Sequence, residues 1–320
     1  MDIGEFLKDE DWDQPFFKLL AHNETGEASG KHGMVVLKDL RKFFPSLDGE
    51  STSSRRPTVD RPLRVEMYLE CTFLAAGMSR YQFQTRGGKR EPESRITGDI
   101  RLLLNRAVEK DILMFQRRLD ELDTYRIILV RKTSKDYLTL NRDLDRRWGT
   151  PFVEIPTTQA EIDDATTELL RAADQKFTLI SPVERVVSRR SRIVRGIVFP
   201  KFVCGEYGNR CCVTDIAIAT PTFVYEVEAA HVVPVSKGGF DDVRNGIALA
   251  QTLHWAFDQG LFGIRGDGTV YLPRQVRELP ESSYLMEFDG KKISQARTEK
   301  CRVHPDALNW HMENCVKQWE

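Results

Sequence analysis

The sequence predicts a two-domain α+β protein. Its 320 residues correspond to two domains at roughly 150 residues per domain. The first half alternates short apolar runs with Gly, Pro and Ser, which is typical of strands joined by turns. A helical stretch follows, and the second half then contains a strand, a turn-rich loop, a second strand and a helix in close succession. Mixed elements of this kind predict helices packed on strands in each half.

The composition excludes several classes of protein. With 41% hydrophobic and 30% charged residues, the chain is too apolar for intrinsic disorder. No apolar run is long enough for a transmembrane helix, and the acidic N-terminal residues do not form a signal peptide. Six cysteines are too few for a disulfide scaffold, so we expect a reduced, cytosolic protein with no membrane partner. Because the net charge is only −1, any nucleic-acid surface must be local.

The first half is expected to be mainly β-structure. Four apolar runs predict strands, at residues 35–37, 63–69, 126–130 and 137–140. Residues 48–61 hold four consecutive Ser or Thr and two prolines, and are predicted to be a loop. Residues 97–108 predict a helix with Thr97 as its N-cap. This mixture favours an α+β domain, or a barrel with helices at its ends.

A helical, basic connector is predicted between the halves. Residues 157–176 begin with a capping-box-like TTQAE and carry apolar residues at near-helical spacing. Residues 181–210 hold seven Lys or Arg against two Glu, a local excess of five positive charges in a neutral chain. Such a stretch is often only a solvated helix face. The alternative, which the residues of 212–264 described next favour, is contact with phosphate groups by Arg189, Arg190 and Arg192.

The residues that suggest catalysis lie in 212–264. His231 ends an expected strand, Asn245 precedes another, and His254 and Asp258 are four apart on an expected helix. Residues i and i+4 share a helix face, so this pair can hold one divalent cation such as Mg²⁺, Mn²⁺, Ni²⁺ or Zn²⁺. His231 can take a proton from water. Asn245 can fix the loop, or bond the backbone so that His231 keeps its tautomer.

This segment resembles an HNH nuclease, the ββα-metal finger, in the variant whose last His is replaced by Asp. The block DVRNGIALAQTLHWAFDQGLFGI carries the resemblance, and RCCVTD and ALNWHMENC extend it over residues 188–320. The resemblance implies that His231 is the general base, Asn245 a structural residue, and His254 and Asp258 the metal ligands. The implied cofactor is a divalent metal ion, Mg²⁺ or Mn²⁺ first, with Zn²⁺ or Ni²⁺ as alternatives.

The chain departs from this family at one metal-ligand position. Many HNH enzymes have Asp or His immediately before the base, where this chain has Ala230. Glu228 is an alternative oxygen donor through water, although alternation along a strand works against it. A structural zinc site is a further alternative, but Cys204, Cys211 and Cys212 lack a downstream CxxC pair. We therefore expect them to be buried thiols.

Two polar, basic, Gly-bearing stretches mark the first half. They lie in residues 19–47 and 78–101, next to expected strands. From residue chemistry alone they are two solvated loops, or else a clamp on a DNA duplex in which Arg reads guanine and Lys meets phosphate. The candidate DNA-contacting residues are Lys31, His32, Arg80, Arg86, Lys89, Arg90 and Arg95.

Both stretches resemble the N-terminal effector-binding domain of the EcoRII restriction endonuclease, a DNA-binding pseudobarrel of the plant B3 kind. The matching pieces are NETG at 23–26, FFPSL at 43–47 and REPESRIT at 90–97, and the resemblance covers residues 16–131. It implies two arms in the major groove, at 25–32 and 86–95. The chain departs where the family has Gly-His-Gln, since it carries Gly30, Lys31 and His32.

Together these observations predict a DNA-recognition domain over 1–156, a basic helical linker over 157–187 and an HNH nuclease domain over 188–320. The expected activity is that of a type II restriction endonuclease acting on double-stranded DNA in phage defence. A homodimer, at least on DNA, is expected because one HNH site attacks one strand. The alternatives are a modification-dependent (type IV) endonuclease and a DNA-binding regulator with a degenerate nuclease domain. The intact set of four motif residues argues against the regulator.

Overall fold

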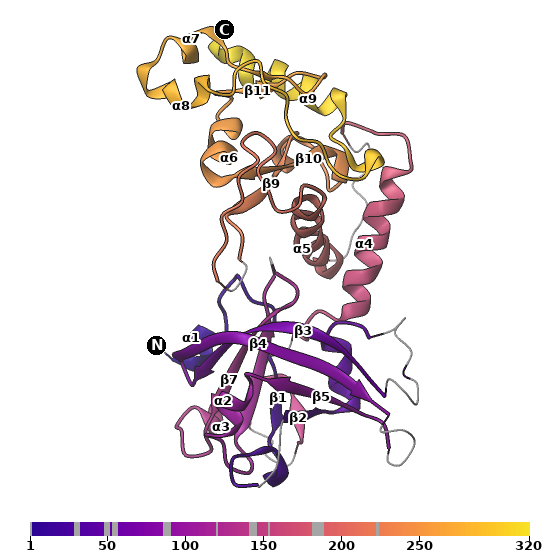
Figure 1. The fold of residues 1–320 in the computed structure, drawn as a ribbon, viewed down its shortest axis with the longest axis vertical. Helices are drawn as coiled ribbons and strands as arrows, with labels where there is room; N and C mark the ends of the chain where they lie inside the picture. Colours follow the sequence, from indigo (N-terminus) through magenta and orange to yellow (C-terminus); the bar gives the residue numbers. More distant parts are fainter. Residues whose placement is uncertain are drawn as a thin grey trace. The chain divides into compact units, whose positions relative to one another are not determined.

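The computed structural model describes the chain in two compact units, Met1–Ala160 and Glu161–Glu320 (Figure 1). The described residues are 2–28, 33–47, 52, 57–85, 91–119, 121–140, 146–152, 154–180, 189–221 and 224–320, without the side chains of 139, 189–193 and 195. Within this described part, no helix is both long and apolar enough to cross a membrane.

The N-terminal unit is built on one eight-stranded sheet, as far as the described residues show, and this sheet curls into a half-barrel. Its order is β2-β5-β4-β3-β7-β6-β1-β8. The strand bounds are β1 Phe16–Leu19, β2 Gly33–Val36, β3 Thr58–Leu69, β4 Thr72–Gln84, β5 Glu93–Gly98, β6 Ile112–Arg117, β7 Thr124–Val130 and β8 Trp148–Gly149. Strands β3 and β7 pair in parallel, and the other neighbours pair antiparallel.

Short helices close the half-barrel. They are α1 Ile3–Phe6, η1 His22–Glu24, η2 Lys38–Phe43, α2 Arg101–Leu104 and α3 Tyr137–Leu140. Strands β6 and β7 are buried along their whole length, because both of their faces carry packed side chains. The α+β class predicted from the sequence is confirmed, and the finer B3-like assignment stays a prediction.

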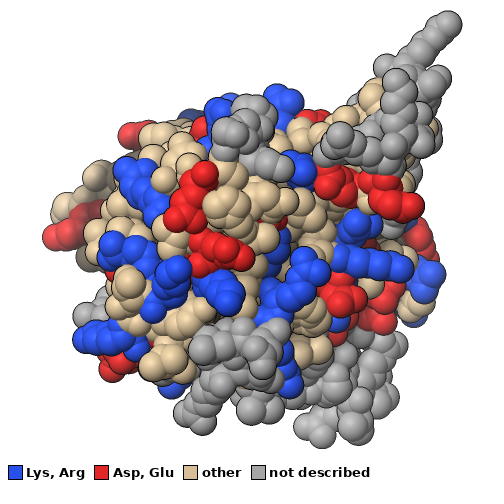
Figure 2. Space-filling model, turned by 90° about the horizontal axis from the view of Figure 1, so that it is seen from below, with Lys and Arg blue, Asp and Glu red and all other residues tan. Residues whose placement is uncertain are grey.

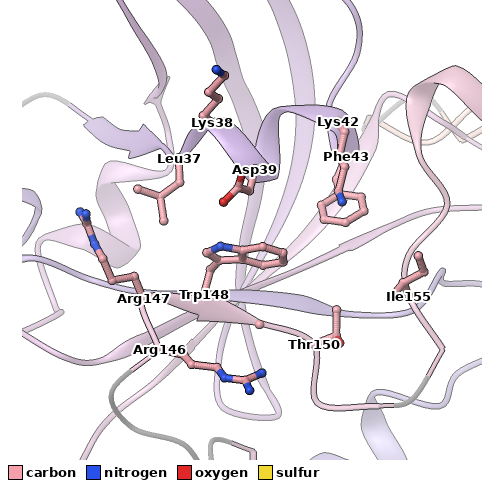
Figure 3. A pocket seen from close by; sticks show the side chains of 11 residues that line it. Leu37, Lys38, Asp39, Lys42, Phe43, Arg146, Arg147, Trp148, Thr150 and Ile155 are labelled. Atoms are coloured by element: carbon pink, nitrogen blue, oxygen red, sulfur yellow. The ribbon is translucent and has the colours of Figure 1, made fainter.

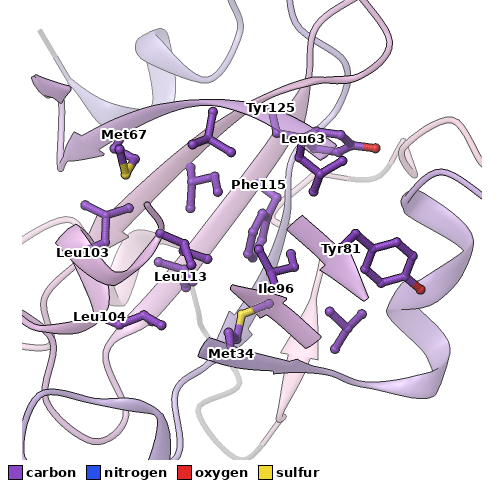
Figure 4. Packing of buried hydrophobic residues seen from close by; sticks show 14 of the residues in the cluster. Met34, Leu63, Met67, Tyr81, Ile96, Leu103, Leu104, Leu113, Phe115 and Tyr125 are labelled. Carbon is purple, nitrogen blue, oxygen red and sulfur yellow. The ribbon is translucent and has the colours of Figure 1, made fainter. Parts of the chain in front are cut away.

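The main core lies inside the curl of the sheet. Figure 4 shows side chains of β2, β3, β5, β6 and α2 pointing toward one another there. The Phe44 ring lies 5.2–5.7 Å from the rings of Phe16, Tyr81, Phe115 and Tyr125, which makes the FFPSL segment part of this core. A second cluster on the opposite face packs Ile3 and Leu7 against alternate residues of β6 and β7.

Three local predictions were wrong. Residues 137–140 form helix α3 rather than a strand, because Tyr137 and Leu140 are three apart and both pack into the second cluster. Residues 58–61 belong to β3 rather than to a loop, since they pair with the far end of β4. The helix predicted over 97–108 is only Arg101–Leu104. Thr97 lies in β5, which ends at Gly98 with φ +90°.

The other strand and connector predictions hold in outline. Strands β3 and β7 contain the predicted runs 63–69 and 126–130, and β2 overlaps the predicted run 35–37. The connector helix is α4 Gln159–Ala173, within the predicted 157–176. It buries one stripe of apolar side chains, at Ile162, Ala165, Leu169 and Ala173, as an amphipathic helix does.

The C-terminal unit contains a small hairpin packed on helices. The main elements are α5 Arg189–Glu206, β9 Val227–His231, β10 Gly246–Ala250 and α6 Gln251–Asp258. Further along lie β11 Gly263–Ile264, β12 Val270–Tyr271, α7 Arg274–Arg277, α8 Ser283–Met286 and α9 Pro305–His311. Helix α5 packs on β9 and β10. Gly246 permits this approach, because a Cβ there would lie 2.7 Å from Val203 and 2.9 Å from Phe199.

The surface carries both signs of charge. Figure 2 shows Lys and Arg side chains interspersed with Asp and Glu side chains over the face that it presents. This agrees with the nearly balanced composition. Any attraction for DNA on this face must therefore come from particular side chains rather than from one broad basic field.

Candidate active site

The catalytic candidates lie on a strand–loop–strand–helix unit, as the sequence predicts. Strands β9 and β10 pair antiparallel with Gly246 opposite His231 and Ala250 opposite Val227. Helix α6 begins at Gln251, directly after β10. This register places His231, at the end of β9, beside the start of β10, where Asn245 immediately precedes the strand.

His231 is held by an aromatic ring and a carboxylate. Its imidazole stacks on Phe199, with the centroids 4.1 Å apart and the planes 14° from parallel. Its Nε2 lies 3.0 Å from Oδ1 of Asp241, and the side chain keeps 24% of its surface exposed. The carboxylate favours a hydrogen on Nε2, so Nδ1 is the nitrogen left to accept a proton.

Sequence reasoning missed Asp241. The signal that could have indicated it is the acidic pair Asp241–Asp242 between a Gly-rich turn and Asn245. Only the hairpin geometry shows that the first of these carboxylates turns toward His231, whereas the second turns toward Arg244.

Asn245 fixes the loop that joins the two strands. Its side chain is buried, its Oδ1 accepts from the Val233 N–H at 2.8 Å, and its Nδ2 donates to the carbonyls of Val233 (3.1 Å) and Phe240 (3.2 Å). Gly239 lies in the same tight turn, where a Cβ would be 1.9 Å from the Val233 oxygen. Of the two roles considered from the sequence, the geometry supports loop fixing.

Arg244 ties this loop to the end of α4. Its guanidinium binds both carboxylate oxygens of Asp242, at 2.7 and 2.9 Å. It also donates to the carbonyl oxygens of Ala172 (2.7 Å) and Gln175 (2.8 Å). A cation bonded to the last carbonyls of a helix stabilises its C-terminus. The predicted connector helix therefore supports the loop between β9 and β10 through one buried Arg, which sequence reasoning also missed.

His254 and Asp258 share one face of α6. The His254 Nε2 lies 3.7 Å from the Asp258 Oδ2, and both side chains are partly exposed. The other ring nitrogen of His254, Nδ1, lies 2.8 Å from Oε2 of Glu228 on β9. The second oxygen of Glu228 accepts from Gln251 at 3.0 Å. Both oxygens of Glu228 thus have partners, His254 and Gln251, and Glu228 lies on the side of the His254 ring that faces away from Asp258.

This donor set fits a divalent cation. A metal-binding His commonly donates its other N–H to a carboxylate, which orients the ring. Glu228 occupies that position, and the His254 Nε2 together with an Asp258 oxygen forms the nitrogen and oxygen pair that such ions accept. The described residues contain no group of three or more His, Cys, Asp or Glu placed to hold a metal.

The cysteines of this unit are free thiols, of which Cys211, Cys212 and Cys301 are buried and Cys204 and Cys315 partly buried. Cys211 and Cys212 are buried, and the Cys204 sulfur lies 3.7 Å from the Val227 carbonyl. Burial raises the pKa of Cys212 well above its ordinary value, so this thiol stays protonated. All six cysteines of the chain are free.

Two of the predicted DNA-contacting residues of the N-terminal unit are described. Arg80 on β4 has 67% of its side chain exposed and pairs with Asp60 at 3.2 Å. Arg95 on β5 pairs with Glu93 at 2.8 Å. Because Arg95 lies opposite Gln82, two residues from Arg80, both arginines lie on the same face of the sheet. Lys31, His32, Arg86, Lys89 and Arg90 lie outside the described residues. Arg189, Arg190 and Arg192 begin α5, and their side chains are not described.

The NETG segment is a buried anchor. Glu24 forms a buried ion pair with Lys18, and its carboxylate accepts from the backbone N–H groups of Val35 (2.6 Å) and Ala21 (3.1 Å). Gly26 packs so closely that a Cβ would lie 2.5 Å from the Asn105 oxygen. Thr25 and Gly26, which begin the first predicted arm (25–32), are therefore packed against the fold, and residues 29–32 of that arm lie outside the described residues.

The two predicted arms join the sheet at opposite ends of β5. The first, 25–32, leads into Gly33, which pairs with Thr97 near the end of β5, and the second, 86–95, runs into the first three residues of β5. The positions of Glu93 and Thr97 are four residues apart on the strand, or about 13 Å.

Comparison with known proteins identifies the second unit. The HNH endonuclease family matches residues 211–265, which include the hairpin, the fixed loop and α6. The C-terminal unit thus contains an HNH endonuclease domain. No curated protein matches the chain.

Two solved structures show partial similarity. The modification-dependent TagI restriction endonuclease is 22% identical, over 36% of this chain and 36% of that one, with a TM-score of 0.30. The N-terminal domain of LlaJI.R1 from Helicobacter pylori is 13% identical, over 44% of this chain and 99% of that domain, also with a TM-score of 0.30. The chain therefore spans about a third of the length of the TagI chain.

Proposed function

We propose that this chain is a restriction endonuclease that recognises a short site in double-stranded DNA and hydrolyses its phosphodiester bonds at the HNH site. One observation supports this proposal most strongly: His231, the loop fixed by Asn245 and the His254–Asp258 pair lie on one hairpin and the helix that follows it. That grouping lies inside the segment matched by the HNH family.

In the proposed reaction His231 takes a proton from water at Nδ1, while Asp241 holds the ring and stabilises its protonated form. His254 and Asp258 hold the divalent ion, Mg²⁺ or Mn²⁺ first, with Zn²⁺ or Ni²⁺ as alternatives. When bound, such an ion neutralises charge on the phosphate and on the leaving oxygen. Glu228 keeps His254 in the orientation that this requires.

Recognition is assigned to the N-terminal part, in a proposed division of 1–156 for recognition, 157–187 as linker and 188–320 for cleavage. Arg80 and Arg95 share a sheet face, and each is paired with a carboxylate that DNA would replace. The two arms, with Lys31, His32, Arg86, Lys89 and Arg90, would reach base edges and phosphates. Arg189, Arg190 and Arg192 would add sequence-independent phosphate contacts.

The proposed assembly on DNA is a homodimer, because one HNH site attacks one strand and a double-strand break needs two. The proposed setting is the bacterial cytoplasm, where phage DNA enters. In this setting the chain would act in phage defence.

The test is digestion of phage DNA, with and without modified bases, followed by run-off sequencing of the ends. A type II enzyme cuts unmodified DNA at one recurring sequence. Cleavage restricted to modified DNA would assign the chain to the modification-dependent class instead. Specific binding without any cleavage, in Mg²⁺ or Mn²⁺, would contradict the endonuclease and support the regulator.

A further inference from the structure

A pocket of about 570 Å³ opens in the N-terminal unit. One wall is the 3₁₀ helix η2, and the other is the segment around β8 (Figure 3). Its volume is in the range of small-ligand sites. Neither the HNH site nor the predicted arms include these residues.

The lining combines one flat ring with mainly positive charge. Figure 3 shows the Trp148 indole below η2, with Arg147 to one side of it and Arg146 on the side away from η2. Among the described residues, the charged ones of the lining are Lys38, Lys42, Arg146, Arg147 and Asp39. Four cations against one carboxylate favour an anionic ligand, and the half-buried indole favours a planar one.

The walls of the pocket are fixed by the fold. On one side, β8 pairs with β1, and Gly149 packs so tightly that a Cβ would lie 3.0 Å from the Phe17 ring. The Leu19 N–H also donates to the Arg147 carbonyl at 3.0 Å. Trp148 is therefore presented from a sheet edge rather than from a free loop.

On the other side, η2 is anchored by its apolar residues. Leu40 and Phe43 are buried, and the Phe43 carbonyl accepts from Arg117 (2.6 Å) and from the Tyr125 hydroxyl (3.0 Å). The Lys42 ammonium lies 5.1 Å from the centre of the Phe43 ring and 6.0 Å from that of Trp148. Cation–π attraction at these distances holds a positive charge beside the indole.

A nucleotide matches this set of groups. A base stacks on an aromatic ring, Lys and Arg meet the phosphate, and a carboxylate accepts a hydrogen bond from an exocyclic amino group such as that of cytosine. A base within a duplex has both faces covered by its neighbours. Only a base taken out of the stack could lie on Trp148, as in enzymes that extrude a nucleotide into a pocket.

We propose that this pocket binds a single nucleotide unstacked from DNA, with an amino-bearing base on Trp148, the amino group on Asp39 and the phosphate among the lysines and arginines. This rests on the proposed function, since the DNA would be that of the endonuclease. The pocket would then bind one base of the recognition site directly, in addition to the contacts made by the two arms.

The experiment measures binding by the full chain in EDTA. The probes are dCMP, dTMP, inorganic phosphate, a fully paired duplex and the same duplex with one unpaired cytosine. We expect dCMP to bind more tightly than dTMP and phosphate, and the unpaired cytosine to raise duplex affinity. Trp148→Ala should weaken binding of dCMP and of the unpaired site about tenfold or more, the loss of one base–aromatic stack.

Three further variants of the pocket and one control keep the result interpretable. Trp148→Phe should restore most of the affinity, and Asp39→Asn should remove the preference for dCMP over dTMP. Lys38→Ala should weaken binding of both nucleotides, whereas Lys8→Ala, the same charge change outside the lining, should not.

Any of three results would overturn the proposed nucleotide binding. They are an unchanged affinity of Trp148→Ala for dCMP, an affinity for phosphate equal to that for dCMP, and an affinity for the duplex that the unpaired cytosine does not raise. Cleavage by the wild-type chain with metal is scored separately. If the chain cleaves DNA but the pocket does not bind nucleotides, only this inference is rejected. If the pocket binds nucleotides but the chain does not cleave DNA, only the proposed endonuclease function is rejected.

Discussion

The Glu228 carboxylate lies 2.8 Å from Nδ1 of His254, on the side of the imidazole opposite Asp258. Glu228 on β9 thereby sets the orientation of His254 on α6, the helix that follows β10. Because of this contact, the Nε2 of His254 faces Asp258. Glu228 therefore has the role of orienting His254 rather than of binding the metal directly.

Glu228→Ala should lower cleavage about 10- to 100-fold at limiting metal, because His254 loses the partner that orients it. Glu228→Gln keeps an acceptor oxygen and should lose less. Cleavage rates over a series of Mn²⁺ concentrations measure this. Glu226→Gln is the control, since Glu226 bonds the Gln251 backbone and no histidine. An Ala variant with a wild-type metal dependence would remove Glu228 from the site.

Asp241→Asn should lower the cleavage rate without weakening DNA binding, because the amide cannot stabilise the protonated ring of His231 as a carboxylate does. His231→Ala should cost more, about 10² to 10⁴-fold, the usual contribution of a general base. Cleavage rates of the wild type and the two variants, with DNA binding measured beside them at the same pH, test the pair. An unchanged rate in Asp241→Asn would show that Asp241 is irrelevant to His231.

Asn245→Ala should destabilise the C-terminal unit by about 2–3 kcal/mol. The change removes three hydrogen bonds and leaves the buried Val233 N–H without its partner. Calorimetric unfolding of the full chain measures the loss. Asn314→Ala removes a single exposed bond to the Trp310 carbonyl and should change stability by less than about 0.5 kcal/mol. Equal effects of the two variants would contradict the role of the fixed loop.

His311 should make the fold acid-sensitive. Burial lowers its pKa from 6.5 to about 4, while its ring stacks on Phe257 and its Nε2 lies 2.9 Å from the Phe257 carbonyl. Between pH 6.5 and pH 4, His311 is therefore protonated in the unfolded chain but not in the folded chain. This contribution is complete above pH 6.5 and is lost as the pH falls toward 4, by about 3 kcal/mol in all.

The measurement is the loss of unfolding free energy between pH 7 and pH 4.5. It should be smaller in His311→Gln than in the wild-type chain. His22→Gln, at an exposed histidine, should leave the loss unchanged. The same acid sensitivity in all three proteins would mean that His311 is not the group responsible.

The sequence indicates the hairpin and helix of the HNH unit because its signals are local. The i, i+4 spacing of His254 and Asp258 needs only a helix, and the structure supplies it as α6. The sequence does not indicate Asp241 or Arg244, and it does not indicate that Glu228 contacts His254, because these partners are set by strand pairing and by contacts with α4.

In the N-terminal unit, burial overrides local preference. Residues 137–140 have strand-like composition but form a helix that covers the sheet. Residues 58–61 look like a loop but extend β3 because β4 offers a partner. The NETG segment carries a family resemblance, yet only the fold shows that Glu24 is a buried anchor for the chain beside the first arm.

The most direct test of the account is plasmid cleavage by the purified full chain with Mg²⁺ or Mn²⁺, compared among the wild type, His231→Ala, Asp258→Ala and the wild type in EDTA. The account predicts nicked or linear product from the wild type alone, with plasmid binding by His231→Ala within a few-fold of wild type. Cleavage that persists in His231→Ala, or in EDTA, would contradict the assigned base or the metal-dependent site.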